Sequence, residues 1–167
     1  VVIISGNALD VNGNVAMMAG SPAGGNPGMA ISGMFAEGAH IIIPIGLEKI
    51  IPGSIQEAVK AAGRDKDLSY GMAVGLIPLI GKVVTEKDAV EILARVKCTV
   101  IGRGGITGGE GSTVMVVEGK EKEVKKLLGI VAGIKGAALS GEESTLEECD
   151  RGPKCGEHKA CIYKRRR

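Results

Sequence analysis

The chain has 167 residues and a formal net charge of +2, with 44% hydrophobic, 24% charged and only 2% aromatic residues. This composition is typical of one or two globular domains, and it disfavours a nucleic-acid partner because much of the basic excess lies in residues 164–167 and few rings are available for stacking. No apolar run reaches the roughly 18 residues of a membrane span and no secretory signal is evident, so we expect a cytoplasmic protein without a membrane partner.

The chain opens with a strand, a turn and a second strand. Residues 1–4 form a β-branched run, which is typical of a buried strand in a parallel sheet, and residues 15–18 can form a short returning strand. Between them, the asparagines and glycine of residues 10–14 favour a turn. The first strand begins without Met, as expected for a piece of a longer protein.

A glycine-rich loop over residues 20–28 leads into a well-signalled helix. We expect Asn26 to be its N-cap residue and Pro27 its first helical residue, with Gly38 just past its end. A second apolar strand follows at residues 40–45.

A Ser54-x-x-Glu57 capping box opens the next, short helix. The order strand, loop, helix, strand, helix is typical of an α/β fold, and we predict a small doubly wound α/β unit over residues 1–64. The polar, charged segment 64–69 is the expected domain boundary.

The pattern of elements changes after this boundary. In chain order, the sequence predicts a strand at 73–80, a helix from residue 85, strands at 98–101 and 113–117, a helix at 120–135 and a short strand at 137–140. This β-α-β-β-α-β order predicts a ferredoxin-like unit over residues 70–140. Residues 141–167 form a polar, cysteine-containing tail.

The glycine-rich loop before the first helix is the first candidate ligand site. Glycines allow an anion to approach the N–H groups at a helix N-terminus, where the helix dipole favours negative charge. The candidate ligand-binding residues are Gly24, Gly25, Asn26 and Gly28. The alternative is a surface loop that needs glycine only to turn, because neither a Walker loop nor a dinucleotide fingerprint is present.

A second glycine-rich segment, residues 102–111, joins the two central strands of the expected ferredoxin-like unit. Successive N–H groups in such a loop can form an anion-binding nest. The candidate ligand-binding residues are Arg103, Gly104, Gly105 and Thr107. A plain hairpin connection or a subunit contact is the alternative, and the loop is therefore also compatible with a homo-oligomer.

The tail contains three cysteines and a histidine within thirteen residues, namely Cys149, Cys155, His158 and Cys161. Three thiolates and an imidazole suffice for a four-coordinate Zn²⁺ site, and metal binding would order a tail that buries little apolar surface. An iron–sulfur cluster with one further ligand, and a set of thiols without metal, are the alternatives. A disulfide staple is disfavoured without a secretory signal.

Four short motifs occur in series between residues 5 and 60: Asp10-x-x-Gly13-Asn14-Val15, Asn26-Pro27-x-Met29-Ala30, the apolar run 41–43, and Leu47-Glu48-Lys49-Ile50-Ile51-Pro52-Gly53. They resemble one segment of the coenzyme A transferase family and of the related lactate-utilisation (LUD) domains. The resemblance covers about a third of the chain. It implies a parallel α/β sheet whose loops hold an acyl-CoA, a carboxylate or a phosphorylated sugar.

The chain lacks the Ser-Glu-Asn-Gly context of the transferases' nucleophile and their upstream oxyanion loop, and Glu48 matches a position that is not the catalytic one. No catalytic residue is therefore assigned, and whether the protein is an enzyme is left open. We expect it to bind a small anionic metabolite. The alternatives are a transferase- or isomerase-type enzyme completed by a missing segment or second subunit, and a metal-binding structural or redox module.

Overall fold

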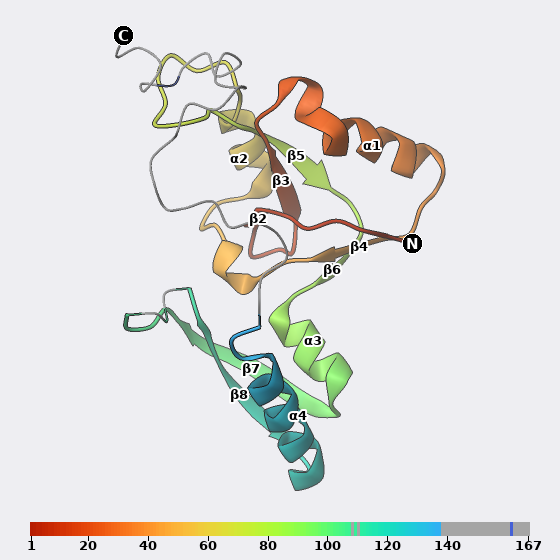
Figure 1. Ribbon diagram of the computed structural model, residues 1–167, viewed down its shortest axis with the longest axis vertical. Coiled ribbons are helices and arrows are strands. Elements are labelled where there is room, and N and C mark those ends of the chain that lie inside the picture. Colours follow the sequence, from red (N-terminus) through yellow and green to blue (C-terminus); the bar gives the residue numbers. More distant parts are fainter. Residues whose placement is uncertain (108, 110, 138–160, 162–167) are drawn as a thin grey trace. The chain divides into compact units, whose positions relative to one another are not determined.

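The computed structural model describes residues 1–107, 109, 111–137 and 161. The chain combines helices with strands, and the strands form several small sheets, so the predicted α/β class is confirmed. The described chain divides into two compact units, the first with residues 1–45, 49–83 and 161 and the second with residues 46–48 and most of 84–137 (Figure 1).

Two three-stranded sheets form the strand framework of the first unit. One has the order β1-β4-β6, with β1 (Val2–Ile3) parallel to β4 (Ile41–Pro44) and β6 at Lys82–Val84. The other is antiparallel and has the order β2-β3-β5, formed by Ala8–Leu9, Val15–Ala19 and Gly75–Leu79.

The strand pairing is thus mixed, unlike the parallel pairing of a doubly wound unit. The reason is local: the tight turn between β2 and β3, in which Gly13 has a φ of 83°, can join only antiparallel neighbours. The expected burial of the first strand is wrong, because Ile3 is 71% exposed.

Helix α2 (Ile55–Ala61) covers the antiparallel sheet of the first unit. Its capping box is confirmed: the Ser54 hydroxyl accepts from the Glu57 N–H, and the Glu57 carboxylate accepts from the Ser54 N–H. The core beneath it consists of small and branched aliphatic residues, namely Ala8, Ala16, Ile51, Ile55, Val59 and Leu76. The unit also contains helix α1 (Gly25–Ala36), described with the candidate site.

A buried carboxylate joins the β2–β3 turn to α2. Asp10 is 2% exposed, and its oxygens accept hydrogen bonds from the N–H groups of Asn12 (2.9 Å), Asn14 (2.9 Å) and Ile55 (3.1 Å) and from the Asn14 side-chain amide (2.9 Å). These bonds, that of the Asn14 amide foremost, lower the pKa of Asp10 to about 2. The bond from Ile55 also satisfies a first-turn N–H of α2 that has no partner within the helix.

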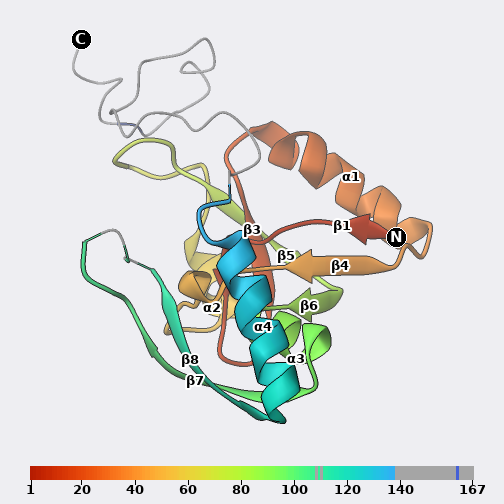
Figure 2. The same cartoon turned by 60° about the horizontal axis from the view of Figure 1, so that its bottom comes forward.

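The second unit is a helix, a long hairpin and a helix. Its elements are α3 (Glu86–Leu93), β7 (Val96–Arg103), β8 (Thr113–Gly119) and α4 (Glu121–Ile134) (Figure 2). The strands β7 and β8 pair antiparallel with a bulge after Val100. Two side chains of α4 bind the backbone at the end of α3: Lys126 donates to the carbonyl of Leu93, the last residue of α3, at 2.7 Å, and Glu123 accepts from the Arg95 N–H at 3.1 Å.

The ferredoxin-like prediction requires a correction at its first strand. The predicted strand at 73–80 is β5, which pairs with β3 in the first unit instead of with the hairpin. For the same reason the units divide after Val83, whereas the charge pattern predicts a boundary at 64–69. The central α-β-β-α order is confirmed, and residues 138–140 of the predicted last strand lie outside the described residues.

Within the part of the chain that the structure describes, no helix combines the length and the apolar character needed to cross a bilayer.

The hydrogen bonds of Asp10 predict a specific acid sensitivity of the first unit. The folded pKa of about 2 lies below the ordinary value of 3.8, so the unfolded chain binds the proton more readily. The stability that Asp10 contributes is therefore complete above about pH 4 and is lost as the pH falls from about 4 toward 2. We expect Asp10→Asn to lower the melting temperature at neutral pH and to flatten the dependence of stability on pH in this window.

Urea unfolding between pH 7 and pH 2, followed through the NMR amide signals of Asn14 and Ile55, measures this effect. Asp65→Asn is the matched control, because Asp65 is exposed and makes none of the Asp10 contacts. An Asp10→Asn variant that keeps the acid response of the wild type would contradict the assignment.

Candidate functional site

The glycine-rich loop folds into a tight left-handed turn before α1. The short 3₁₀ helix η1 (Pro22–Gly24) leads directly into α1, and the φ angles of Ala23, Gly24 and Gly25 are 53°, 77° and 65°. Among the described residues, Ala23 is the one non-glycine residue with a positive φ. Such conformations cost free energy and persist where the surrounding structure requires them.

The predicted N-cap of α1 is wrong. Gly24 occupies the N-cap position without a side-chain cap, and the helix begins at Gly25, so Asn26 and Pro27 lie within its first turn. The reason is the left-handed backbone at Gly24, which completes the turn earlier than a side-chain cap at Asn26 would. The predicted end is confirmed, because Gly38 has a φ of 64° just past Ala36.

A hollow with a volume of about 450 Å³ lies at this helix N-terminus. Its wall is formed by the end of β3, by η1 and by the first turn of α1, with the lining residues Met17, Met18, Ala19, Gly20, Ser21, Pro22, Gly24, Gly25, Asn26 and Pro27. Three of the four predicted ligand residues of this loop, Gly24, Gly25 and Asn26, therefore line one hollow.

Gly28 does not line the hollow, and its surroundings explain the glycine differently. A Cβ at this position would lie 2.7 Å from the Ala23 carbonyl oxygen and 3.3 Å from Cδ1 of Ile77. Glycine at position 28 therefore allows α1 to pack closely against η1 and β5.

The hollow is electrostatically suited to a negative group. The first turn of α1 contains no acidic residue, and the positive end of its dipole lies at the wall of the hollow. The N–H groups of Gly24 and Gly25 donate to the Ser21 and Pro22 carbonyls and Pro27 has no N–H, which leaves the Asn26 N–H as the first-turn donor for a ligand. The Arg64 guanidinium adds positive charge nearby, since its Nε donates to the Gly20 carbonyl at 2.6 Å.

The second predicted loop uses part of its N–H groups internally. The Gly104 N–H donates to the Ser112 carbonyl at 2.9 Å, and the Gly109 N–H donates to the Ile106 carbonyl at 2.7 Å. The Gly104 N–H, one of the donors expected in an anion-binding nest, is therefore already bonded within the loop. This favours the alternative of a plain hairpin connection. The side chains of Arg103 and Thr107 are exposed, and these residues belong to the second unit, so they form a separate candidate site.

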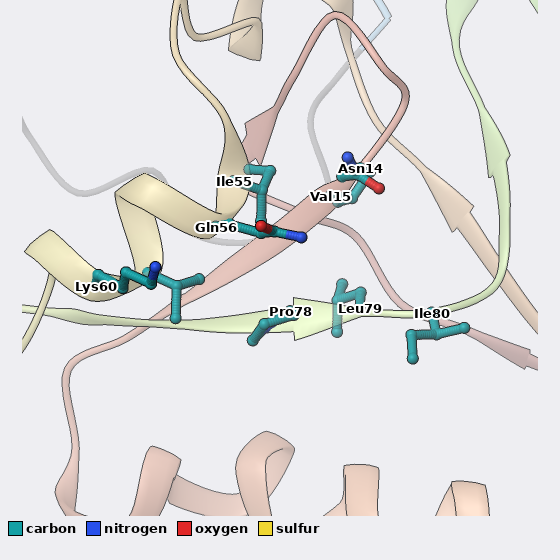
Figure 3. Close-up of a pocket in the computed structure, with 9 residues that line it drawn as sticks. Asn14, Val15, Ile55, Gln56, Lys60, Pro78, Leu79 and Ile80 are labelled. Atoms are coloured by element: carbon teal, nitrogen blue, oxygen red, sulfur yellow. The ribbon is translucent and has the colours of Figure 1, made fainter.

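A second hollow, of about 400 Å³, is one that the sequence does not predict. It lies where α2 faces β3 and β5, and it is lined by Asn14, Val15, Ile55, Gln56, Val59, Lys60, Pro78, Leu79 and Ile80 (Figure 3). These residues come from three separate segments of the chain, and the sequence of each segment is typical of an ordinary core or surface segment. No motif could have revealed it.

Most of the predicted metal site lies outside the described residues, namely Cys149, Cys155 and His158. The fourth candidate ligand, Cys161, is 1% exposed, carries a free thiol and forms an isolated bridge with Ser69. Among the described residues, no group of three or more His, Cys, Asp and Glu side chains is placed to hold a metal ion. The zinc and iron–sulfur assignments stay predictions.

Comparisons with protein-family models, with curated proteins and with solved structures found no match for this chain. The resemblance to coenzyme A transferases therefore stays a prediction. The assignment of the hollow at α1 as a candidate site therefore depends on the geometry of the first unit alone.

The packing of Gly28 predicts opposite effects for two glycines of one helix. Gly28→Ala places a methyl group against the Ala23 carbonyl, so we expect it to destabilise the first unit by about 1–3 kcal/mol. Gly33→Ala meets no atom within 4 Å and should stabilise it by about 0.5–1 kcal/mol, because alanine favours the helix. Urea unfolding followed by circular dichroism measures both, and equal effects of the same sign would contradict the packing argument.

Proposed function

We propose that the hollow at the N-terminus of α1 binds a small anionic metabolite through the backbone N–H and the side chain of Asn26. The observation that supports this function is the meeting of Gly24, Gly25 and Asn26 in one hollow beside a helix turn that lacks acidic residues. Such a site recognises negative charge without a cationic side chain in its lining.

The size of the hollow favours a compact anionic group. A volume of about 450 Å³ is within the range of ligand sites but is small for a complete coenzyme A. An organic acid, a phosphorylated compound, or the acyl or phosphate end of a CoA ester is therefore the expected occupant. Hydrogen bonding dominates over ion pairing, because the lining residues carry no formal charge.

The lining also favours binding over catalysis. General acid–base chemistry requires a group that exchanges a proton near neutral pH, and none of the lining side chains is an acid, a histidine or a lysine. The Ser21 hydroxyl is the one nucleophilic group of the lining, and none of the other lining side chains can act as its base. Recognition of an anion therefore fits these residues better than its conversion.

The substitution Asn26→Asp separates ligand binding from folding. A carboxylate in the first turn of α1 interacts favourably with the helix dipole, so stability should rise by about 0.3–1 kcal/mol at low ionic strength. The same charge repels an anionic ligand, so affinity should fall by about tenfold. Calorimetric titration with acetate, malate, inorganic phosphate and acetyl-coenzyme A measures the affinity, and thermal unfolding measures the stability.

Asn12→Asp is the matched control, because it makes the same chemical change at an exposed position of the turn before β3. It should leave the affinity unchanged. If none of the four probes binds the wild-type protein, or if both variants weaken binding equally, the proposed function is wrong.

A further inference from the structure

We propose that the second hollow, between α2 and the strands β3 and β5, is a separate binding site for a monocarboxylate with an apolar body of about six carbons. The site goes beyond the proposed function, because it has a different lining and different chemistry. The two hollows share no lining residue.

The walls of this hollow are apolar on both sides. Val15 and Leu79 lie opposite each other in the β3–β5 pair, and Ile55 and Val59 are one helical turn apart on α2. Figure 3 shows Pro78 and Leu79 at the end of β5, Ile80 just after the strand, and Ile55, Gln56 and Lys60 on the neighbouring helix. Burial of a hydrocarbon body between these walls is the main source of affinity.

The charges at the two ends of the hollow determine the orientation of the ligand. Lys60 is exposed and, among the described residues, has neither an ion-pair nor a hydrogen-bond partner. At the other end, the Asn14 amide donates to the negatively charged Asp10. A carboxylate is therefore attracted to the Lys60 end and disfavoured at the Asn14 end.

The geometry of Asn14 adds a neutral polar contact. Its side-chain nitrogen donates to Asp10 at 2.9 Å, which fixes the amide orientation and leaves its carbonyl oxygen as an acceptor beside the hollow. The Gln56 amide lies between the two ends on the same helix as Lys60. A ligand with a hydroxyl group at the end opposite to its carboxylate can use the Asn14 acceptor.

The length of the site limits the ligand. Ile55 and Lys60 are separated by about 7.5 Å along the helix axis, since each residue advances the helix by about 1.5 Å. An extended body of about six carbons spans this distance and fits within about 400 Å³. A carboxylate of this size, straight, branched or aromatic, is the chemical class that the hollow accommodates.

Three six-carbon probes with different head groups test the assignment: hexanoate, 1-hexanol and hexylammonium. Titration into the isotope-labelled full chain should shift the NMR methyl signals of Val15, Ile55, Val59 and Leu79, with hexanoate bound about fivefold more tightly than 1-hexanol. Lys60→Glu should weaken hexanoate about tenfold and make hexylammonium the preferred probe. Lys66→Glu, an exposed charge reversal outside the lining, should change neither affinity.

A second variant tests the apolar wall without disturbing the core. Ile80 is 73% exposed, so Ile80→Asn should fold normally and weaken all three probes alike. Asn26→Asp should not affect hexanoate, which separates this site from the proposed function. The proposal is overturned if the probes bind equally well, if they shift signals away from the hollow, or if Lys60→Glu leaves the preference for hexanoate unchanged.

Discussion

The carboxylate of Asp10 is the interaction on which the first unit depends. It accepts four hydrogen bonds, from the turn between β2 and β3 and from the first N–H of α2, and so joins a hairpin to the helix that covers it. Two of its partners, Asn14 and Ile55, also line the hollow at α2. A buried charge is tolerated here because each hydrogen bond favours its ionised form.

Glycine allows backbone segments to pack closely in a protein that has few aromatic side chains to fill its core. A Cβ at Gly6 would lie 2.2 Å from Cγ1 of Val15 and 3.0 Å from Cδ1 of Ile45, so glycine is needed where the chain passes from one sheet of the first unit to the other. Gly28 has the same role between α1 and η1. With 27 glycines and one Phe in the sequence, the protein fills its interior by bringing backbones together.

The two hollows of the first unit differ in how they would select a ligand. The hollow at α1 offers the N–H and side-chain amide of Asn26 and no ionisable side chain, which suits a compact anion held by hydrogen bonds. The hollow at α2 offers aliphatic walls and one lysine, which suits an apolar body with a single negative end. The strand β3 contributes to both linings, through Val15 in the hollow at α2 and through Met17, Met18 and Ala19 in the hollow at α1.

Features that depend on neighbouring residues can be predicted from the sequence. The Ser54 capping box, the turn before β3, the amphipathic helix that became α4 and the glycine-rich loop at α1 all follow from local spacing, and the α/β class follows from their order. The pairing of β5 with β3, the N-cap at Gly24 and the hollow beside Lys60 could not be predicted in this way and are seen in the folded structure alone. The strand pairing and the hollow depend on contacts between segments that are distant in the chain. The N-cap depends on a left-handed backbone at Gly24, a conformation that glycine can adopt but that its presence in the sequence does not predict.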